Sequence, residues 1–215
     1  MSEVDDDVPQ LSAETFVALQ EFYKEQAQKE EKLKSGLTQP SEDAIPIDED
    51  WQLSQFWYDE NTVNTLVMAV LKCIKPNSKI ALISCPTLYQ RMKHEAGSDS
   101  EVSLFEYDQR FALYGSDFIL YDYKSPLDIP RNLSSYYDIV IADPPFLSEE
   151  CLTKTAVTMK FLTKGKLVLC TGAIMADLAE RLLDVRKCHF KPGHVNNLAN
   201  EFCCYANFNL DAFIK

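Results

Sequence analysis

The feature that most constrains the fold is a short apolar run that ends in two consecutive prolines. The run is Tyr137-Asp138-Ile139-Val140-Ile141-Ala142, and Asp143-Pro144-Pro145-Phe146 follows it directly. A short apolar stretch bounded by turn formers is typical of a strand that is buried on both faces, as in a parallel sheet. The two prolines end this strand and stiffen the loop beyond its carboxyl end. Ligands bind at that edge of an open α/β sheet, so the loop is the first candidate for a functional site.

The chain from residue 51 onward alternates between strand-like and helix-like segments. Strands are predicted over 79–84, 101–106, 118–121, 137–142 and 166–171, and helices over 61–74, 87–96, 151–162 and 174–183. Such alternation predicts an α/β fold with a doubly wound parallel sheet. Residues 188–192 and 202–208 are predicted to add a closing antiparallel pair.

The first 50 residues form a predicted N-terminal helical acidic extension. Apolar residues recur at helical spacing over 12–34, and Gly36 can end that helix, while 37–50 is rich in acids and prolines and reads as a linker. We therefore expect an extension over 1–50 and an α/β domain over 51–215. The extension is either a solubilising arm or an arm that docks a substrate or partner.

The charge of the chain is concentrated in this extension. Residues 1–50 hold 14 acidic and 4 basic side chains, a net of −10, which leaves −2 of the total −12 for the rest. Proteins that bind nucleic acids usually present a basic face to the phosphates. An acidic arm repels DNA and attracts a basic protein, so the charge favours a basic protein partner and no nucleic acid.

Cysteine usage and hydropathy predict a cytoplasmic protein without a membrane or metal site. The seven cysteines are scattered and include no Cys-x-x-Cys pair, as expected for free thiols in a reducing compartment. The amino end is acidic where a signal peptide is basic, and the apolar stretch 66–71 is too short to span a bilayer. Cys188 and His189 with His194 form a cluster, but their spacing fits no common zinc pattern.

The Asp143 loop has the chemistry to hold an amino group. Pro144 and Pro145 have no N–H to donate, so the loop presents carbonyl oxygens, and Asp143 adds a carboxylate acceptor. Phe146 adds an apolar wall. These groups suit an amine, which donates hydrogen bonds and must lose a proton. The plain structural alternative is a strand end closed by a proline turn with a surface aspartate.

The chain also resembles a known enzyme family. A strand followed by Asp/Asn-Pro-Pro-aromatic is the signature of S-adenosylmethionine enzymes that methylate amino groups, including the adenine amino group. Three further stretches carry the resemblance: Trp51-Gln52-Leu53-Ser54-Gln55-Phe56-Trp57-Tyr58, Leu104-Phe105-Glu106-Tyr107-Asp108-Gln109-Arg110-Phe111 and Asn200-Glu201-Phe202-Cys203-Cys204. Together they are similar to the eukaryotic protein-lysine methyltransferases that act on translation elongation factor one-alpha, over roughly residues 50 to 215.

The resemblance implies a seven-stranded Rossmann-like class I methyltransferase sheet whose last strand is antiparallel. S-adenosyl-L-methionine is then the implied cofactor, lying across the carboxyl ends of the first strands. Glu106, with Asp108 two residues on, is placed to accept the ribose hydroxyls. Asp122 is placed to meet the adenine amino group, and Tyr123 to stack on the ring. Each acid taken alone also fits an ordinary solvated strand end.

The loop after the first strand departs from the usual pattern. Cofactor loops commonly carry glycines so that the backbone can approach the ligand, but Ser84-Cys85-Pro86-Thr87 contains none. We nevertheless expect Ser84, Cys85 and Pro86 to leave room for the methionine portion of the cofactor. The aromatic segment that contains Trp57 either folds over the cofactor or plugs the sheet.

The reaction that these residues favour is transfer of a methyl group to an amine, and the resemblance implies that the amine belongs to a lysine of elongation factor one-alpha. Asp143 and the Pro144 carbonyl orient the amine, and Phe146 walls the channel and attracts the partly cationic nitrogen. Asp143 is an orienting group rather than a general base in this hypothesis, because a carboxylate also stabilises the ammonium form. Two alternatives stay open. One is methylation of the adenine amino group in DNA or RNA, and the other is an inactive Rossmann-like module that binds a basic protein.

Overall fold

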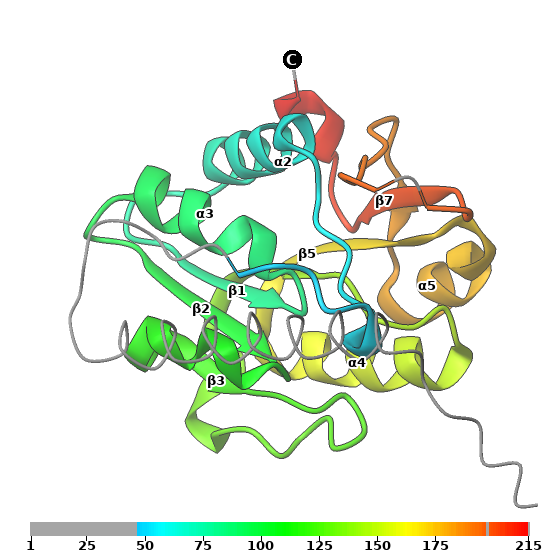
Figure 1. Ribbon diagram of the computed structural model, residues 1–215. Helices are drawn as coiled ribbons and strands as arrows, with labels where there is room; N and C mark the ends of the chain where they lie inside the picture. The colour runs from blue at the N-terminus through cyan, green and yellow to red at the C-terminus, as the bar shows by residue number, and fades with distance from the viewer. Residues whose placement is uncertain (1–46, 197, 215) are drawn as a thin grey trace, which may run out of the picture. The chain divides into compact units, whose positions relative to one another are not determined.

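The structure is a computed structural model that describes residues 47–214 with the exception of residue 197, and the side chain of Trp51 is not described. Its centre is a seven-stranded sheet with the order β3-β2-β1-β4-β5-β7-β6 (Figure 1). The strands are β1 Lys79–Ile83, β2 Glu101–Glu106, β3 Phe118–Leu120, β4 Tyr137–Ala142, β5 Thr163–Gly172, β6 Arg186–Lys187 and β7 Phe202–Ala206. Strands β1 to β5 are parallel, whereas β7 runs antiparallel to both β5 and β6. The expected α/β class and the antiparallel last strand are confirmed.

The central strands are buried because their side chains are apolar on both faces. In β1 the residues from Ile80 to Ile83 are fully buried, and in β4 Tyr137 and the run from Ile139 to Ala142 are buried too. Because helices pack on both faces of the sheet, these central strands have no solvent face, which explains why neither sequence alternates. This packing fixes the carboxyl ends of β1 and β4 side by side, since Ile83 pairs with Ala142.

Helices cover the two faces of the sheet. They are α2 Glu60–Cys73, α3 Tyr89–Ala96, α4 Glu149–Leu162 and α5 Ala176–Leu183. Figure 1 shows α2 and α3 on one side of the sheet and α4 and α5 on the other. Helix α2 is capped by Asp59, which accepts from Thr62 N, and α4 is capped by Ser148, which accepts from Cys151 N.

Short 3-10 helices connect these elements. They are η1 Trp51–Leu53, η2 Pro86–Leu88, η3 Gln109–Asp117, η4 Arg131–Leu133, η5 Ala173–Met175 and η6 Leu210–Phe213. The longest, η3, lies in a segment where the sequence predicted no element. Asp108 caps it by accepting from Arg110 N, and Gly115 kinks it with a φ of 61°. The predicted helix 87–96 likewise starts as a 3-10 turn at Pro86 before α3 begins.

The strand predicted over 188–192 is wrong. The strand β6 lies earlier, at Arg186–Lys187, and Cys188 N still donates to Cys204 O. Beyond it the backbone amide of His189 donates to the carboxylate of Asp211, at 2.9 Å and 3.1 Å, instead of to a strand. Pro192 has no amide hydrogen to continue a ladder. The chain therefore leaves the sheet at residue 189.

The predicted helix 12–34 lies outside the described residues. Chain contacts group Asp48–Lys215 as one compact unit. Glu49 and Asp50, which we assigned to the linker, bond to the segment that follows them: Glu49 Oε1 accepts from Trp57 N, and Asp50 O accepts from Leu53 N and Gln55 N. The boundary at 50/51 between extension and domain stays a prediction.

Candidate active site

A cavity of about 750 Å³ opens at the carboxyl edge of the parallel strands. It brings together nearly all of the residues that the sequence singled out, namely Trp57, Ser84, Cys85, Pro86, Glu106, Asp122, Tyr123, Asp143, Pro144 and Phe146. Apart from Trp57, which precedes the sheet in sequence, these residues lie at the ends of four parallel strands or in the loops that follow them, so the sheet itself collects them. The volume lies within the range of about 300–1,000 Å³ that is usual for sites that bind small molecules.

The loop after β1 makes its tight turn without glycine. Ser84 adopts the left-handed region, with a φ of 53°, and its amide donates to Phe105 O at 2.9 Å. A left-handed residue costs a non-glycine side chain some strain, which this hydrogen bond helps to offset. Cys85 is buried, and its Sγ donates to Ile141 O. Pro86 then starts η2, so the loop backbone is fixed at the cavity wall.

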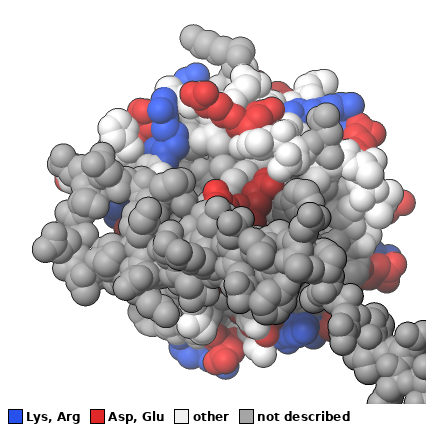
Figure 2. All heavy atoms as spheres, viewed as in Figure 1, with Lys and Arg blue, Asp and Glu red and all other residues white. Residues whose placement is uncertain are grey.

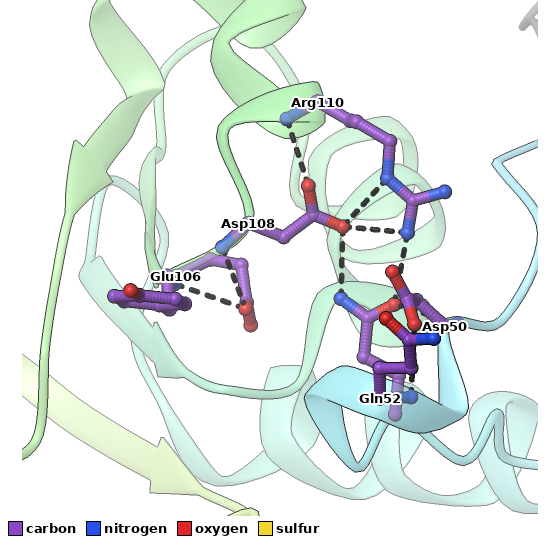
Figure 3. A network of polar contacts seen from close by, with 7 residues as sticks. Asp50, Gln52, Glu106, Asp108 and Arg110 are labelled. Atoms are coloured by element: carbon purple, nitrogen blue, oxygen red, sulfur yellow. Dashed lines mark hydrogen bonds and ion pairs between the residues drawn. The ribbon is translucent and has the colours of Figure 1, made fainter. Parts of the chain in front are cut away.

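Glu106 ends β2 with its carboxylate at the cavity. The amides of Tyr107 and Asp108 donate to Oε1 at 2.9 Å and 3.2 Å (Figure 3). Burial raises the pKa of Glu106 to about 7, although these two amide bonds act in the opposite direction. Within the described part of the chain, no hydrogen bond reaches Oε2. That oxygen is available to a ligand with hydroxyl donors.

Asp108 differs from Glu106 in the partners of its carboxylate. It is not among the residues that line the cavity, and its carboxylate is engaged elsewhere. Oδ1 accepts from Arg110 N, while Oδ2 accepts from Gln55 Nε2 at 2.9 Å and from Arg110 Nε at 2.8 Å (Figure 3). Burial acts to raise its pKa, but the bonds from Arg110 and Gln55 lower it overall. Asp108 thus anchors neighbouring segments, and its contact with a cofactor stays unconfirmed.

The residues after β3 lie at the cavity but beyond the strand. The strand ends at Leu120, and Asp122 Oδ1 accepts from Lys124 N in the turn that follows. The ring of Tyr123 meets the ring of Phe146 edge-on, with centroids 5.8 Å apart. These two aromatic side chains therefore join the β3 loop to the Asp143 loop.

Asp143 stands at the end of β4 in a largely apolar setting. Its amide donates to Ile83 O at 3.0 Å, which holds the loop to β1. The hydroxyl of Tyr58 donates to its Oδ2 at 2.5 Å. Burial raises the pKa of Asp143 to about 7, the hydrogen bond from Tyr58 opposes that shift, and the charge of Glu106 adds to it. Beyond the prolines, Phe146 is 42% exposed, so its ring stands at the cavity mouth.

A segment before the core, residues 49–58, lies along the cavity, and we call it the strap. At one end Gln55 bonds to Asp108 and accepts from Arg110 Nη2. At the other end Trp57 O accepts from Val195 N, and Tyr58 forms a β-bridge with His194. Residues 52–58 all line the cavity. The aromatic segment thus forms part of the cavity wall, and its contact with the cofactor stays a prediction.

Sequence reasoning gave no role to His194 and Phe202, which complete this wall. The His194 ring packs between Tyr58, with centroids 5.1 Å apart, and Phe202, with centroids 4.8 Å apart. Burial lowers the pKa of His194, so the ring is neutral near pH 7. Phe202 lies in a stretch that carried the family resemblance, which was a usable signal. His194 sits in an irregular loop with no local pattern to reveal it.

Two further observations concern only the residues that the structure describes. No helix in this part of the chain is long and apolar enough to cross a membrane. No group of three or more histidine, cysteine or acidic side chains within it could hold a metal ion.

Comparison with known proteins identifies the family. A family profile described as "Probable N6-adenine methyltransferase" matches residues 49–210. The chain is 51% identical over 210 residues to EEF1A lysine methyltransferase 1 of Gallus gallus, covering 97% of this chain and 98% of that protein. The chain belongs to the family of EEF1A lysine methyltransferase 1. The human protein of the same name is 47% identical, covering 95% of this chain and 94% of that protein.

The fold is also shared with more distant proteins. The branched-chain polyamine synthase C9 mutein of Thermus thermophilus superimposes with a TM-score of 0.60 at 11% identity. That match covers 83% of this chain and 62% of the other. At such low identity it establishes the fold alone.

Proposed function

We propose that this protein is an S-adenosylmethionine-dependent protein-lysine methyltransferase that modifies a lysine of translation elongation factor one-alpha. The observation that carries the proposal is that Glu106 and Asp143 line one cavity at the ends of β2 and β4. A carboxylate suited to ribose and a loop suited to an amine are thereby neighbours. The names of the relatives support the choice of substrate. A cytoplasmic location follows from a substrate that works in translation.

The residues of the cavity fit the cofactor. The free Oε2 of Glu106 can accept ribose hydroxyl hydrogens, and Asp122 and Tyr123, which line the same cavity, would contact the adenine. The loop from Ser84 to Pro86 and the strap residue Trp57 supply the remaining walls. When bound, the cofactor supplies a methyl group on a positively charged sulfur. Asp108 supports this site indirectly, by fixing the strap through Gln55.

The Asp143 loop orients the acceptor amine. Asp143 and the Pro144 carbonyl accept its N–H hydrogens, so that its lone pair is directed into the cavity. Phe146 and Tyr123, whose rings meet at the mouth, exclude water and attract the partly cationic nitrogen. No covalent enzyme intermediate is needed for this transfer.

Burial gives Asp143 more capacity to accept a proton than the sequence suggested. A free lysine has a pKa of about 10.4 and an exposed aspartate about 3.9, a gap of roughly 6.5. With the pKa of Asp143 raised to about 7, that gap is roughly halved. Asp143 can therefore both orient the amine and hold its proton transiently.

The adenine amino group is the second candidate acceptor. The description of the matching family favours it, and the Asp143 loop would suit a planar amine as well. The distribution of charged side chains on the surface argues against a nucleic-acid acceptor. On the face shown in Figure 2, the visible described residues place acidic and basic side chains side by side without a continuous basic patch. A nucleic-acid substrate would call for such a patch.

One transfer experiment tests the proposal. The purified protein is incubated with methyl-labelled cofactor and, separately, with elongation factor one-alpha, DNA and RNA. We expect label in the elongation factor that protease removes and nuclease does not, and its localisation to a lysine by mass spectrometry. Label in DNA or RNA alone would establish the second candidate. The Asp143→Ala variant is the control for transfer that does not use the site.

A further inference from the structure

Tyr58 is a buried side chain at the acceptor site that the proposed reaction has not yet used. It is only 4% exposed, and its hydroxyl donates to Asp143 Oδ2 at 2.5 Å across 85 positions of sequence. Within the described residues, no hydrogen bond reaches the other carboxylate oxygen, Oδ1. One oxygen of Asp143 is thus held by the protein, and the other is available to a substrate.

The Tyr58 ring is fixed independently of its hydroxyl. It packs on His194, which in turn packs on Phe202. The flanking backbone is bonded to the loop around His194, because Asp59 N donates to Gly193 O at 3.1 Å and Val195 N donates to Trp57 O at 2.9 Å. A ring fixed in this way has little freedom to lose when its hydroxyl bonds to a partner, so the contact is preorganised.

The hydroxyl stays a donor at physiological pH. Burial, and then the neighbouring charge of Asp143, raise the pKa of Tyr58 well above its usual value. The other titratable groups near this pair are Glu106, the Cys85 and Cys170 thiols, and His194. Burial also raises the pKa of Cys85 well above its usual value and lowers that of His194. Neither Tyr58 nor Cys85 loses its proton near pH 7.

We propose that Tyr58 is a positioning residue of the acceptor site, whose hydroxyl holds Asp143 Oδ2 so that Oδ1 accepts the substrate amine. The inference rests on the proposed amine transfer. Its physical content is twofold. The hydrogen bond fixes the rotation of the carboxyl group, and it favours the ionised form that can accept from an amine. Tyr58 itself transfers no proton and contacts neither reactant.

The test removes the hydroxyl and keeps the ring. Tyr58→Phe should leave cofactor affinity within about twofold but lower kcat by about tenfold or more, since the bond lost is to a charged group. The acid limb of the kcat–pH profile, measured at saturating cofactor, should move to higher pH, because the donor that favoured ionised Asp143 is gone. Glu106 is present in both the wild type and Tyr58→Phe, so its titration contributes equally to the two pH profiles.

Tyr89→Phe is the matched control. The Tyr89 hydroxyl also donates to an aspartate, Asp117, at 2.7 Å, but Tyr89 does not line the cavity. This variant should keep the wild-type kcat and pH profile. A second comparison places Tyr58→Phe in an Asp143→Asn background, where it should have little further effect if Tyr58 acts through Asp143.

One readout is independent of the substrate. The carboxyl carbon of Asp143, followed by NMR during a pH titration, should titrate at higher pH in Tyr58→Phe than in the wild type. An unchanged titration, or a wild-type kcat and pH profile, would overturn the positioning role. So would an undiminished effect of Tyr58→Phe in the Asp143→Asn background. A wild-type protein that transfers no methyl group to the elongation factor would contradict the proposed function instead, and the titration would still decide the role of Tyr58.

Discussion

Glu106 and Asp143 are two acids whose surroundings bring their pKa values to about 7 in one cavity. Burial is the main cause for both. The donors that favour the ionised forms, two backbone amides for Glu106 and the Tyr58 hydroxyl for Asp143, only partly offset it. Each carboxyl is therefore poised between its two forms near neutral pH, and a ligand that donates hydrogen bonds selects the ionised one.

Cofactor affinity should accordingly depend on pH through Glu106. In the proposed function ribose hydroxyls donate to the ionised carboxylate, whose population grows as the pH rises through about 7. Calorimetry should show binding that strengthens between pH 6 and pH 8. Glu106→Gln should bind about tenfold more weakly at pH 8 and lose part of this pH dependence, because its amide carries no charge.

Glu101→Gln is the control for that measurement. Glu101 begins the same strand, at the end away from the cavity, and should leave both the affinity and its pH dependence unchanged. Titration of the ligand itself is common to all three proteins and cancels in the comparison. If Glu106→Gln keeps the full wild-type pH dependence, another group binds the ribose.

At the scale of elements, the strap is held in place by the loop that contains Gly193. Gly193 N donates to Thr62 Oγ1 at 2.8 Å, and its carbonyl accepts from Asp59 N. A Cβ atom on Gly193 would lie 2.3 Å from Asp59 Oδ2. The other oxygen of that carboxylate caps α2 by accepting from Thr62 N, so the group is not free to move away. The loop, the strap and the start of α2 therefore meet at this glycine.

Gly193→Ala should destabilise the fold and loosen the strap. We expect a loss of about 1–3 kcal/mol in the free energy of unfolding, as for other overpacked sites, with weaker methyl transfer. Chemical denaturation measures the first effect. Gly165→Ala is the matched control, because a Cβ there meets nothing within 4 Å and the residue is exposed. Equal stability of the two variants would show that Asp59 adapts without cost.

The accuracy of the bounds predicted from the sequence differs from one element to another. Strands with apolar side chains on both faces, such as β2 and β4, were predicted with their observed bounds, because burial and local pattern agree there. β6 was misplaced because its two exposed residues carry no apolar pattern, and an aspartate 22 positions away ends it. The carboxylates of the site were predicted from the strand ends. The Tyr58–Asp143 bond and the role of Asp108 come from tertiary contacts that no local signal reveals.

At the scale of the whole molecule, charge is distributed unevenly along the chain. Residues 1–46 hold 11 acidic and 4 basic side chains, a net of −7. Glu49 and Asp50 bond to later residues of the strap and are therefore not counted with this arm. An acidic arm raises the local concentration of a basic partner, an effect that salt screens.

Removal of residues 1–46 tests whether the arm steers the substrate. The deletion spares Glu49 and Asp50, and the remaining chain should stay folded because Asp48–Lys215 forms one compact unit. We expect kcat/KM on intact elongation factor to fall at low salt, mainly through slower association, and the deficit to shrink as salt is added. A short lysine peptide serves as a control substrate. Wild-type kcat/KM at low salt would show that the arm only solubilises the protein.

The most direct measurement compares Asp143→Ala and Glu106→Ala in two assays, cofactor affinity by calorimetry and the rate of methyl transfer at saturating cofactor. Asp143→Ala should keep the wild-type affinity and lose at least about 100-fold in rate, because the residue orients the acceptor amine. Glu106→Ala should lose about tenfold or more in affinity and recover most of the rate once cofactor is saturating. A wild-type rate in Asp143→Ala, or a wild-type affinity in Glu106→Ala, would contradict the division of the cavity into an acceptor side and a cofactor side.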